Sequence, residues 1–154
     1  MSTALAHPKD EIDKVAAVRA LANLMDAAFT LPGTNIRVGL DALLGLLPVI
    51  GDAISSAIGS YIIVIASHLG VSKAVLARMA LNQGIDMLIG IVPLVGDVFD
   101  IGWKANLRNA KLLEQALADP RGANRQSLLL VSGLVLALLA LTAGTAALTW
   151  WMLR

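Results

Sequence analysis

The chain has 154 residues, of which 57% are hydrophobic and 15% are charged, and its formal net charge is +1. This length corresponds to about one domain, and the excess of hydrophobic residues favours a membrane protein over a soluble domain. The small net charge excludes a bulk attraction to nucleic acid, the 4% of aromatic residues is too low for base stacking, and the lack of cysteine excludes disulfides and thiolate metal sites.

Residues 1–34 are predicted to form a loose tail and an amphipathic helix that begins at Asp10. The N-terminal residues are charged where a signal peptide is apolar, so we expect no cleavage. Apolar side chains recur at helical spacing along one side of this helix, at Val18, Leu21, Met25 and Phe29. The turn-forming residues Leu31-Pro32-Gly33-Thr34 are expected to end it.

Two copies of one motif follow, 45 residues apart. The first is Gly39–Asp52 (GLDALLGLLPVIGD) and the second is Gly84–Asp97 (GIDMLIGIVPLVGD). Self-similarity at this distance is typical of a structural repeat. We therefore divide the centre of the chain into a first hairpin repeat, residues 35–83, and a second, residues 84–118.

Each copy of the motif predicts an apolar helical hairpin with a break in its middle. Proline lacks the amide donor that a helix interior needs, and glycine closes helices in the left-handed conformation. The predicted breaks are therefore Pro48 with Gly51 and Pro93 with Gly96. A new helix is expected to start at Asp52 and again at Asp97.

Residues 53–67 form an uncharged, largely apolar stretch that is shorter than the ~20 residues of a perpendicular span. This stretch is predicted to be either a short span or one arm of a re-entrant hairpin. Gly70 is expected to end it, and Ser72 is expected to cap a small amphipathic helix that runs through Asn82.

The helix after the second motif is predicted to be amphipathic, with a basic face formed by Lys104, Arg108 and Lys111. This face suits the headgroup layer of a membrane, and an ordinary solvated face explains it equally well. Residues 119–126, which begin with Asp119-Pro120-Arg121-Gly122, are predicted to be a linker.

Residues 127–154 are predicted to form a transmembrane helix, because the uncharged run from Ser127 exceeds the ~20 residues of a span. Arg121 and Arg125 precede this run, and only Arg154 follows it. By the positive-inside rule, the C-terminus lies outside the bacterial inner membrane and the hairpins dip in from the cytoplasm. Small residues at packing intervals predict a homo-oligomer; they are Gly133, Ala137, Ala140 and Gly144.

The aspartates of the two motifs are the candidate functional residues; they are Asp41, Asp52, Asp86 and Asp97. Ionisable groups inside membrane segments are costly and therefore raise a functional hypothesis. Two homologous hairpins around a pseudo-twofold axis would gather these carboxylates, whose oxygens suit a hard cation or a proton relay. The competing interpretation is structural, with the aspartates capping helices or pairing with basic residues.

No motif in the chain predicts an enzyme or a cofactor site. His7 and His68 are isolated and lack the spacing of metal ligands. Ser55, Ser56 and Ser60 have no nucleophile elbow around them, and a helix–helix contact explains them better.

Short motifs spread over roughly residues 20–118 carry a resemblance to a known family. They are Leu31-Pro32-Gly33-Thr34, Gly39-Leu40-Asp41, Pro48 with Gly51-Asp52, and Pro93-Leu94-Val95-Gly96-Asp97 through Lys104-Ala105-Asn106-Leu107-Arg108-Asn109. They resemble a family of small bacterial and fungal membrane proteins described only as a domain of unknown function. The resemblance implies a membrane-associated α-helical protein. It does not extend over the C-terminal span, and it implies no activity, substrate or catalytic residue.

The sequence thus predicts an all-α membrane protein and leaves two functional hypotheses. In the first, the protein is a small oligomeric channel or transporter whose aspartates line a cation or proton path. In the second, it is a non-catalytic scaffold whose hairpins and basic helix organise lipids or a partner. The lipid bilayer is the expected partner in both.

Overall fold

The computed structural model describes residues 8–40, 44, 50–90 and 104–154, and these residues are almost entirely helical, as predicted. The described helices are α1 (Pro8–Ala27), α3 (Ile50–His68), α4 (Lys73–Gly90), α6 (Ala105–Ala118) and α7 (Pro120–Met152). Two short strands, β1 (Phe29–Thr30) and β2 (Arg37–Val38), pair antiparallel between α1 and the first motif.

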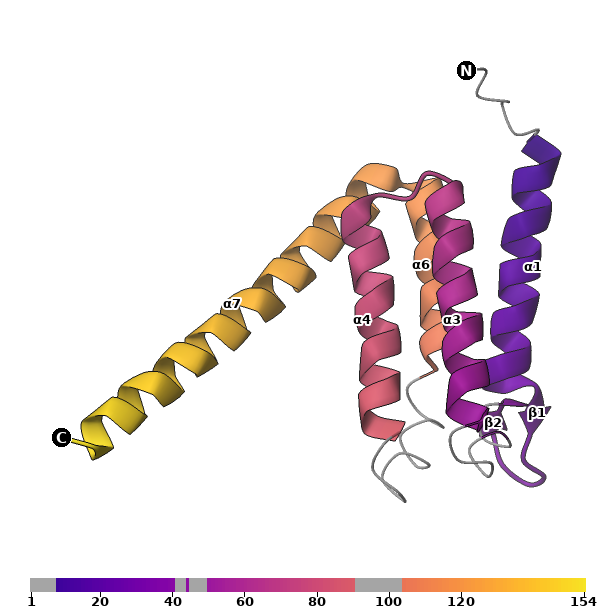
Figure 1. The fold of residues 1–154 in the computed structure, drawn as a ribbon. Helices are drawn as coiled ribbons and strands as arrows, with labels where there is room; N and C mark the ends of the chain where they lie inside the picture. The colour runs from indigo at the N-terminus through magenta and orange to yellow at the C-terminus, as the bar shows by residue number, and fades with distance from the viewer. Residues whose placement is uncertain (1–7, 41–43, 45–49, 91–103) are drawn as a thin grey trace.

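Four of the helices, α1, α3, α4 and α6, lie side by side as a bundle (Figure 1). The N-terminus of α1, the turn between α3 and α4, and the junction of α6 with α7 all lie at one end of this bundle. From that end α7 leaves on the side of α4 and slopes back past the bundle toward the other end. The first turns of α7 pack on α4 and α6, and the rest of the helix extends away from the bundle.

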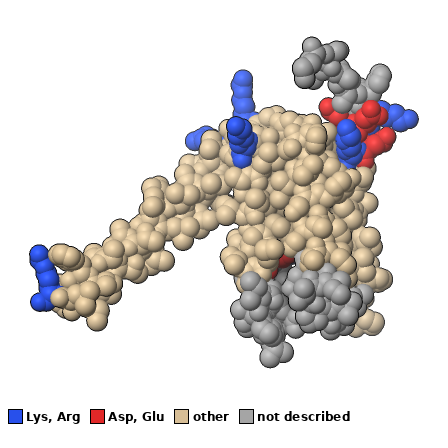
Figure 2. Space-filling view, in the orientation of Figure 1, with Lys and Arg blue, Asp and Glu red and all other residues tan. Residues whose placement is uncertain are grey.

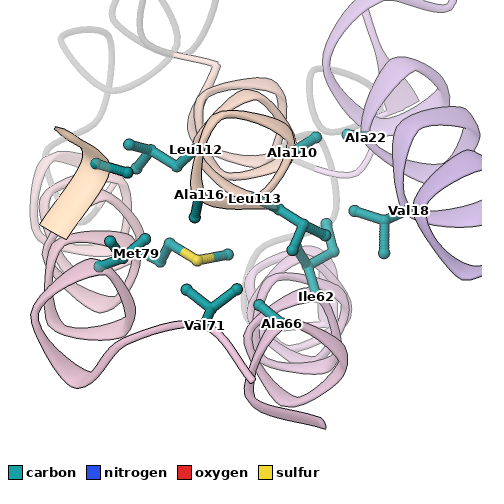
Figure 3. Close-up of a cluster of buried hydrophobic side chains, with 12 residues drawn as sticks. Val18, Ala22, Ile62, Ala66, Val71, Met79, Ala110, Leu112, Leu113 and Ala116 are labelled. Carbon is teal, nitrogen blue, oxygen red and sulfur yellow. The ribbon is translucent and has the colours of Figure 1, made fainter. Parts of the chain in front are cut away.

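The core of the bundle lies where α6 faces α3, with α1 and α4 on either side (Figure 3). Val18 of α1, Ile62 of α3, Met79 of α4 and Leu113 of α6 are each at most 1% exposed. Each such side chain stabilises the fold by about 1.5–3 kcal/mol when it leaves water. Alanines between the large side chains let the helices approach one another; they include Ala22, Ala66, Ala110 and Ala116.

The turn between α3 and α4 follows local sequence signals and confirms two predictions. Gly70 has a positive φ of 78°, and the amides of Gly70 and Val71 donate to carbonyls in the last turn of α3. This is the left-handed closure that glycine permits. The hydroxyl of Ser72 then accepts a hydrogen bond from the amide of Val75 at 3.4 Å, as an N-cap does.

Helix α4 continues past Asn82, where the sequence predicted that a small helix ends. It runs without interruption to Gly90, so the first half of the second motif is part of the same helix. Gly84 weakens a helix interior by about 1 kcal/mol relative to alanine, and this is too little to break a helix that packs on three neighbours. The division of the repeats between residues 83 and 84 therefore lies inside α4.

The end of α1 also differs from its prediction. The helix ends at Ala27, and Phe29 lies in β1 with 55% of its surface exposed, not on the apolar side of the helix. The predicted turn at Leu31–Thr34 is present, because Gly33 has a φ of 78° and the amide of Thr34 donates to the carbonyl of Leu31. The turn reverses the chain and lets β2 pair with β1.

The predicted linker at residues 119–126 is wrong, because these residues start α7. The carboxylate of Asp119 accepts a hydrogen bond from the amide of Gly122 at 3.0 Å, and Pro120 occupies the first helical turn. Aspartate before a helix and proline in its first turn are start signals as well as turn signals. The bundle and the long helix are consequently joined with only Asp119 between α6 and α7.

Candidate functional site

The polar side chains that the structure brings together converge on α6, the helix that contacts all four others. Its N-terminus is capped from a distant part of the chain. Lys104, the residue before α6, has a left-handed backbone with φ of 52° and makes no side-chain cap. The cap comes from Asp26 near the end of α1, whose Oδ2 accepts a hydrogen bond from the amide of Leu107 at 2.8 Å.

Asp26 is 6% exposed and is fixed by a second bond. Its Oδ1 accepts a hydrogen bond from Nδ2 of Asn106, also at 2.8 Å, and Asn106 is fully buried. The partial positive charge at the start of a helix favours a carboxylate in this position. The strained backbone of Lys104 is secured next to it, because Nζ of Lys104 donates to the carbonyl of Arg37 at 2.8 Å.

Further along α6, a pair of asparagines joins this helix to α4. Asn109 is fully buried, accepts a hydrogen bond from Nδ2 of Asn82 at 2.9 Å, and donates to the carbonyl of Met79 at 3.1 Å. On the other side, an exposed ion pair of 3.2 Å joins Glu114 of α6 to Arg19 of α1. These contacts fix the register of α6 against its neighbours, and sequence reasoning did not find them.

We expect replacement of Asp26 by alanine to destabilise the bundle by about 2–4 kcal/mol, because it removes the acceptor shared by the amide of Leu107 and the buried side chain of Asn106. Asp26→Asn keeps one acceptor oxygen and should lose less. Thermal unfolding in detergent, followed by circular dichroism, measures both. The matched control is Asp13→Ala on the exposed part of α1. Equal midpoints for Asp26→Ala and the control would show that the cap does not stabilise the fold.

Of the four candidate aspartates of the motifs, Asp52 and Asp86 are among the described residues. Asp41 and Asp97 lie outside the described residues. Asp52 is the third residue of α3, which starts two residues before the predicted restart, so its backbone is that of the first turn. Asp86 is half-buried on α4. Of the predicted breaks, Gly51 is inside the first turn of α3, and Pro48, Pro93 and Gly96 lie outside the described residues.

The predicted basic face of α6 is divided by its contacts. Arg108 and Lys111 are exposed on α6, whereas Lys104 is half-buried and its ammonium group donates to the carbonyl of Arg37 in β2. Within the described part of the chain, no group of three His, Cys, Asp or Glu side chains is placed to hold a metal ion.

Helix α7 is the second distinctive feature, because beyond its first turns its apolar side chains meet no other described part of the chain. Only Ala123 and Ser127 near its start are buried, and its most apolar 18-residue window has no buried residue. From Ser132 onward, its hydroxyl groups bond within the helix: Ser132, Thr142, Thr145 and Thr149 each donate to a carbonyl three or four residues earlier. A helix with self-satisfied polar groups is compatible with hydrocarbon.

The end of α7 carries the aromatic residues expected near a membrane surface. The guanidinium group of Arg154 lies 5.1 Å from the centre of the Trp150 ring, within the range of a cation–π interaction. A Cβ added at Gly133 or Gly144 would meet no other described part of the chain within 4 Å. The small-residue stretch of α7 is therefore open for the predicted self-association.

The described residues define a helical-bundle protein with one helix that is long and apolar enough to cross a membrane. The family model for the domain of unknown function DUF4112 matches residues 14–117, about two-thirds of the chain, and the chain therefore belongs to this family. No curated protein and no solved structure matches the chain. The matched range begins within α1 and ends within α6, so the family domain is the bundle and α7 lies beyond it.

Proposed function

We propose that the protein is an integral membrane protein, held in the bacterial cytoplasmic membrane by α7, whose DUF4112 bundle is a non-catalytic scaffold at the cytoplasmic side. The observation that carries this proposal is the exposure of α7. Large apolar side chains cover the helix from Leu128 to Leu153, and most are more than half exposed. Each costs about 1.5–3 kcal/mol when it stays in water, so an apolar surrounding is strongly favoured.

The orientation rests on the distribution of basic residues. Arg121 and Arg125 are in the first turns of α7, and Arg154 is alone at its other end. Figure 2 shows basic side chains gathered at the end of the bundle where α7 starts, and a further basic group at the far tip of α7. The more basic end faces the cytoplasm by the positive-inside rule, so the C-terminus faces outward.

The scaffold hypothesis is favoured over the cation path by the way the bundle is filled. Its described interior is packed with apolar side chains of α1, α3, α4 and α6. Asp26, the acidic residue buried there, uses both carboxylate oxygens to hold the start of α6. A cation or proton path along the motif aspartates stays a prediction about Asp41, Asp52, Asp86 and Asp97.

Ion flux separates the two hypotheses. Proteoliposomes that contain the full chain should take up monovalent and divalent cations and protons no faster than empty liposomes, because a scaffold conducts nothing. A double variant, Asp41→Asn with Asp86→Asn, should leave this background unchanged. The matched positive control is a known cation ionophore added to the same vesicles.

A flux above the background that the double variant abolishes, at unchanged melting temperature, would contradict the scaffold and support the path. Asparagine keeps the size and most of the hydrogen bonding of aspartate and removes its charge. A loss of flux without a loss of folding would therefore be an effect of the charge itself.

A further inference from the structure

The outward surface of α3 is uncharged over most of its length, unlike the outward surfaces of α1 and α6. Between residues 53 and 67, its exposed positions carry no charge; they are Ala53, Ile54, Ala57, Ser60, Tyr61, Val64 and Ser67. Tyr61 is 56% exposed and Val64 is 50% exposed. Ile54, Ala57, Tyr61 and Val64 follow one another at spacings of three and four residues, so they form one stripe along the helix.

The opposite side of the bundle is charged. Viewed along the bundle, α6 lies across the core from α3, with α1 and α4 on either side (Figure 3). The outward positions of α6 include Arg108 and Lys111, and the ion pair of Arg19 with Glu114 lies between α6 and α1. The bundle as a whole is therefore amphipathic, with an uncharged α3 side and a charged α6 side.

The flank of the bundle that Figure 2 presents is also nearly free of charge. Basic and acidic side chains crowd the end where α7 starts, and the flank below them is uncharged except for one recessed acidic group beside the undescribed residues. Lys73, exposed at the start of α4, lies at this charged end, next to the turn that joins α3 to α4. A band of charge above an uncharged flank is the pattern of a surface that enters a membrane from one side.

The position of α7 brings this flank to the membrane. Because α7 follows α6 after a single residue and its first turns pack on α4 and α6, the span cannot be separated from the bundle by a long tether. Helix α7 starts at the charged end and slopes back past the bundle toward its other end (Figure 1). If α7 enters the bilayer at the charged end of the bundle, the bundle lies beside the first part of α7 and therefore at the same depth in the bilayer.

We propose that the outer stripe of α3, formed by Ile54, Ala57, Tyr61 and Val64, contacts the hydrocarbon core of the same bilayer that α7 crosses, while the α6 side of the bundle faces water. The DUF4112 domain is then partly embedded and binds lipid through α3. This inference rests on the proposed membrane anchoring by α7. It agrees with the solvated interpretation of the basic face of α6 and not with the headgroup interpretation, which would place the α6 side of the bundle toward the bilayer.

Single cysteines test the proposal directly, because the chain has no cysteine of its own. We choose Tyr61→Cys and Val64→Cys on α3, Lys111→Cys on α6, and Leu139→Cys on α7, all at exposed positions that leave the core intact. Each full-length variant is placed in vesicles of phosphatidylethanolamine and phosphatidylglycerol. A membrane-impermeant maleimide should label the α3 and α7 positions at least about tenfold more slowly than Lys111→Cys, because the reactive thiolate does not form in hydrocarbon. Sites that face the vesicle interior are included by adding the reagent to both sides.

A spin label at the same positions distinguishes lipid from a protein partner. In hydrocarbon, collisions with oxygen exceed collisions with a water-soluble nickel complex, and a label buried against protein meets neither. The proposal is overturned if α7 is protected and the α3 positions react as fast as Lys111→Cys, or if the α3 labels are shielded from both agents. Fast labelling of Leu139→Cys as well would instead overturn the anchoring by α7.

Discussion

Replacing Gly39 by alanine is expected to destabilise the bundle strongly, whereas the same change at Gly84 should stabilise it. The two glycines open the two copies of the repeated motif and are equivalent in sequence. Their surroundings differ. A Cβ at Gly39 would overlap the backbone carbonyl of Met25 and the backbone nitrogen of Asp26, whereas a Cβ at Gly84 would meet none of the described residues within 4 Å.

The size of the two effects follows from these contacts. At Gly39 the obstacle is backbone at the end of α1, which cannot swing aside, so we expect a loss of about 3 kcal/mol or more. The displaced segment includes Asp26, so the hydrogen bond by which Asp26 caps α6 should be weakened as well. At Gly84, in the interior of α4, alanine removes the entropic penalty of glycine and should add up to about 1 kcal/mol.

Thermal unfolding of both variants in detergent measures the difference. Gly39→Ala should melt roughly 10 °C or more below the unmodified protein, and Gly84→Ala at or slightly above it. Similar shifts for the two variants would mean that the chain does not approach Gly39 as closely as described, and that the copies of the motif are equivalent in structure as well as in sequence.

Features that depend on neighbouring residues could be predicted from the sequence. Gly70 closes α3, Ser72 caps α4, and Leu31–Thr34 forms a turn, because each acts through backbone groups a few residues away. The long C-terminal helix also follows from composition alone, since a run of more than ~20 uncharged residues has few alternatives. The predicted all-α class is confirmed by the described residues, which are almost entirely helical.

Features that depend on distant residues could not be predicted. The cap of α6 by Asp26 joins residues about eighty positions apart, and nothing around Asp26 distinguishes it from the acidic residues on the surface of α1. The hydrogen bond between Asn82 and Asn109 likewise has no signal in the sequence that predicts it. A polar residue on a helix becomes informative only when the packing partner of that helix is known.

Some sequence signals have more than one structural meaning. Asp119-Pro120 is typical of a linker, and the same two residues also start helices well, as they do in α7. The helix that is predicted to end at Asn82 instead continues into the start of the second copy as part of α4. Packing on α3, α6 and α7 keeps α4 helical through Gly84, where local propensity alone is weak.

A pair of lysines in α7 should abolish membrane insertion without harming the bundle. Leu136 and Leu139 are 65% and 60% exposed and lie in the middle of the uncharged run. Lysine at the centre of a span costs about 2.5–3.5 kcal/mol, where leucine is favourable, so the double change should cost roughly 6 kcal/mol or more. The matched control is Leu136→Ala with Leu139→Ala, which keeps the run uncharged. The double-lysine variant should leave the membrane fraction or lose its transmembrane orientation, and the control should not.

The central claim is that α7 crosses the membrane with Arg154 on the outer side. Alkaline phosphatase fused after Arg154 tests it most directly in intact bacterial cells, because this enzyme is active only outside the cytoplasm and a fluorescent protein at the same place is bright only inside. We predict an active phosphatase and a dark fluorescent protein on the unmodified chain, and the reverse on Leu136→Lys with Leu139→Lys. An inactive phosphatase with a bright fluorescent protein on the unmodified chain would contradict the claim.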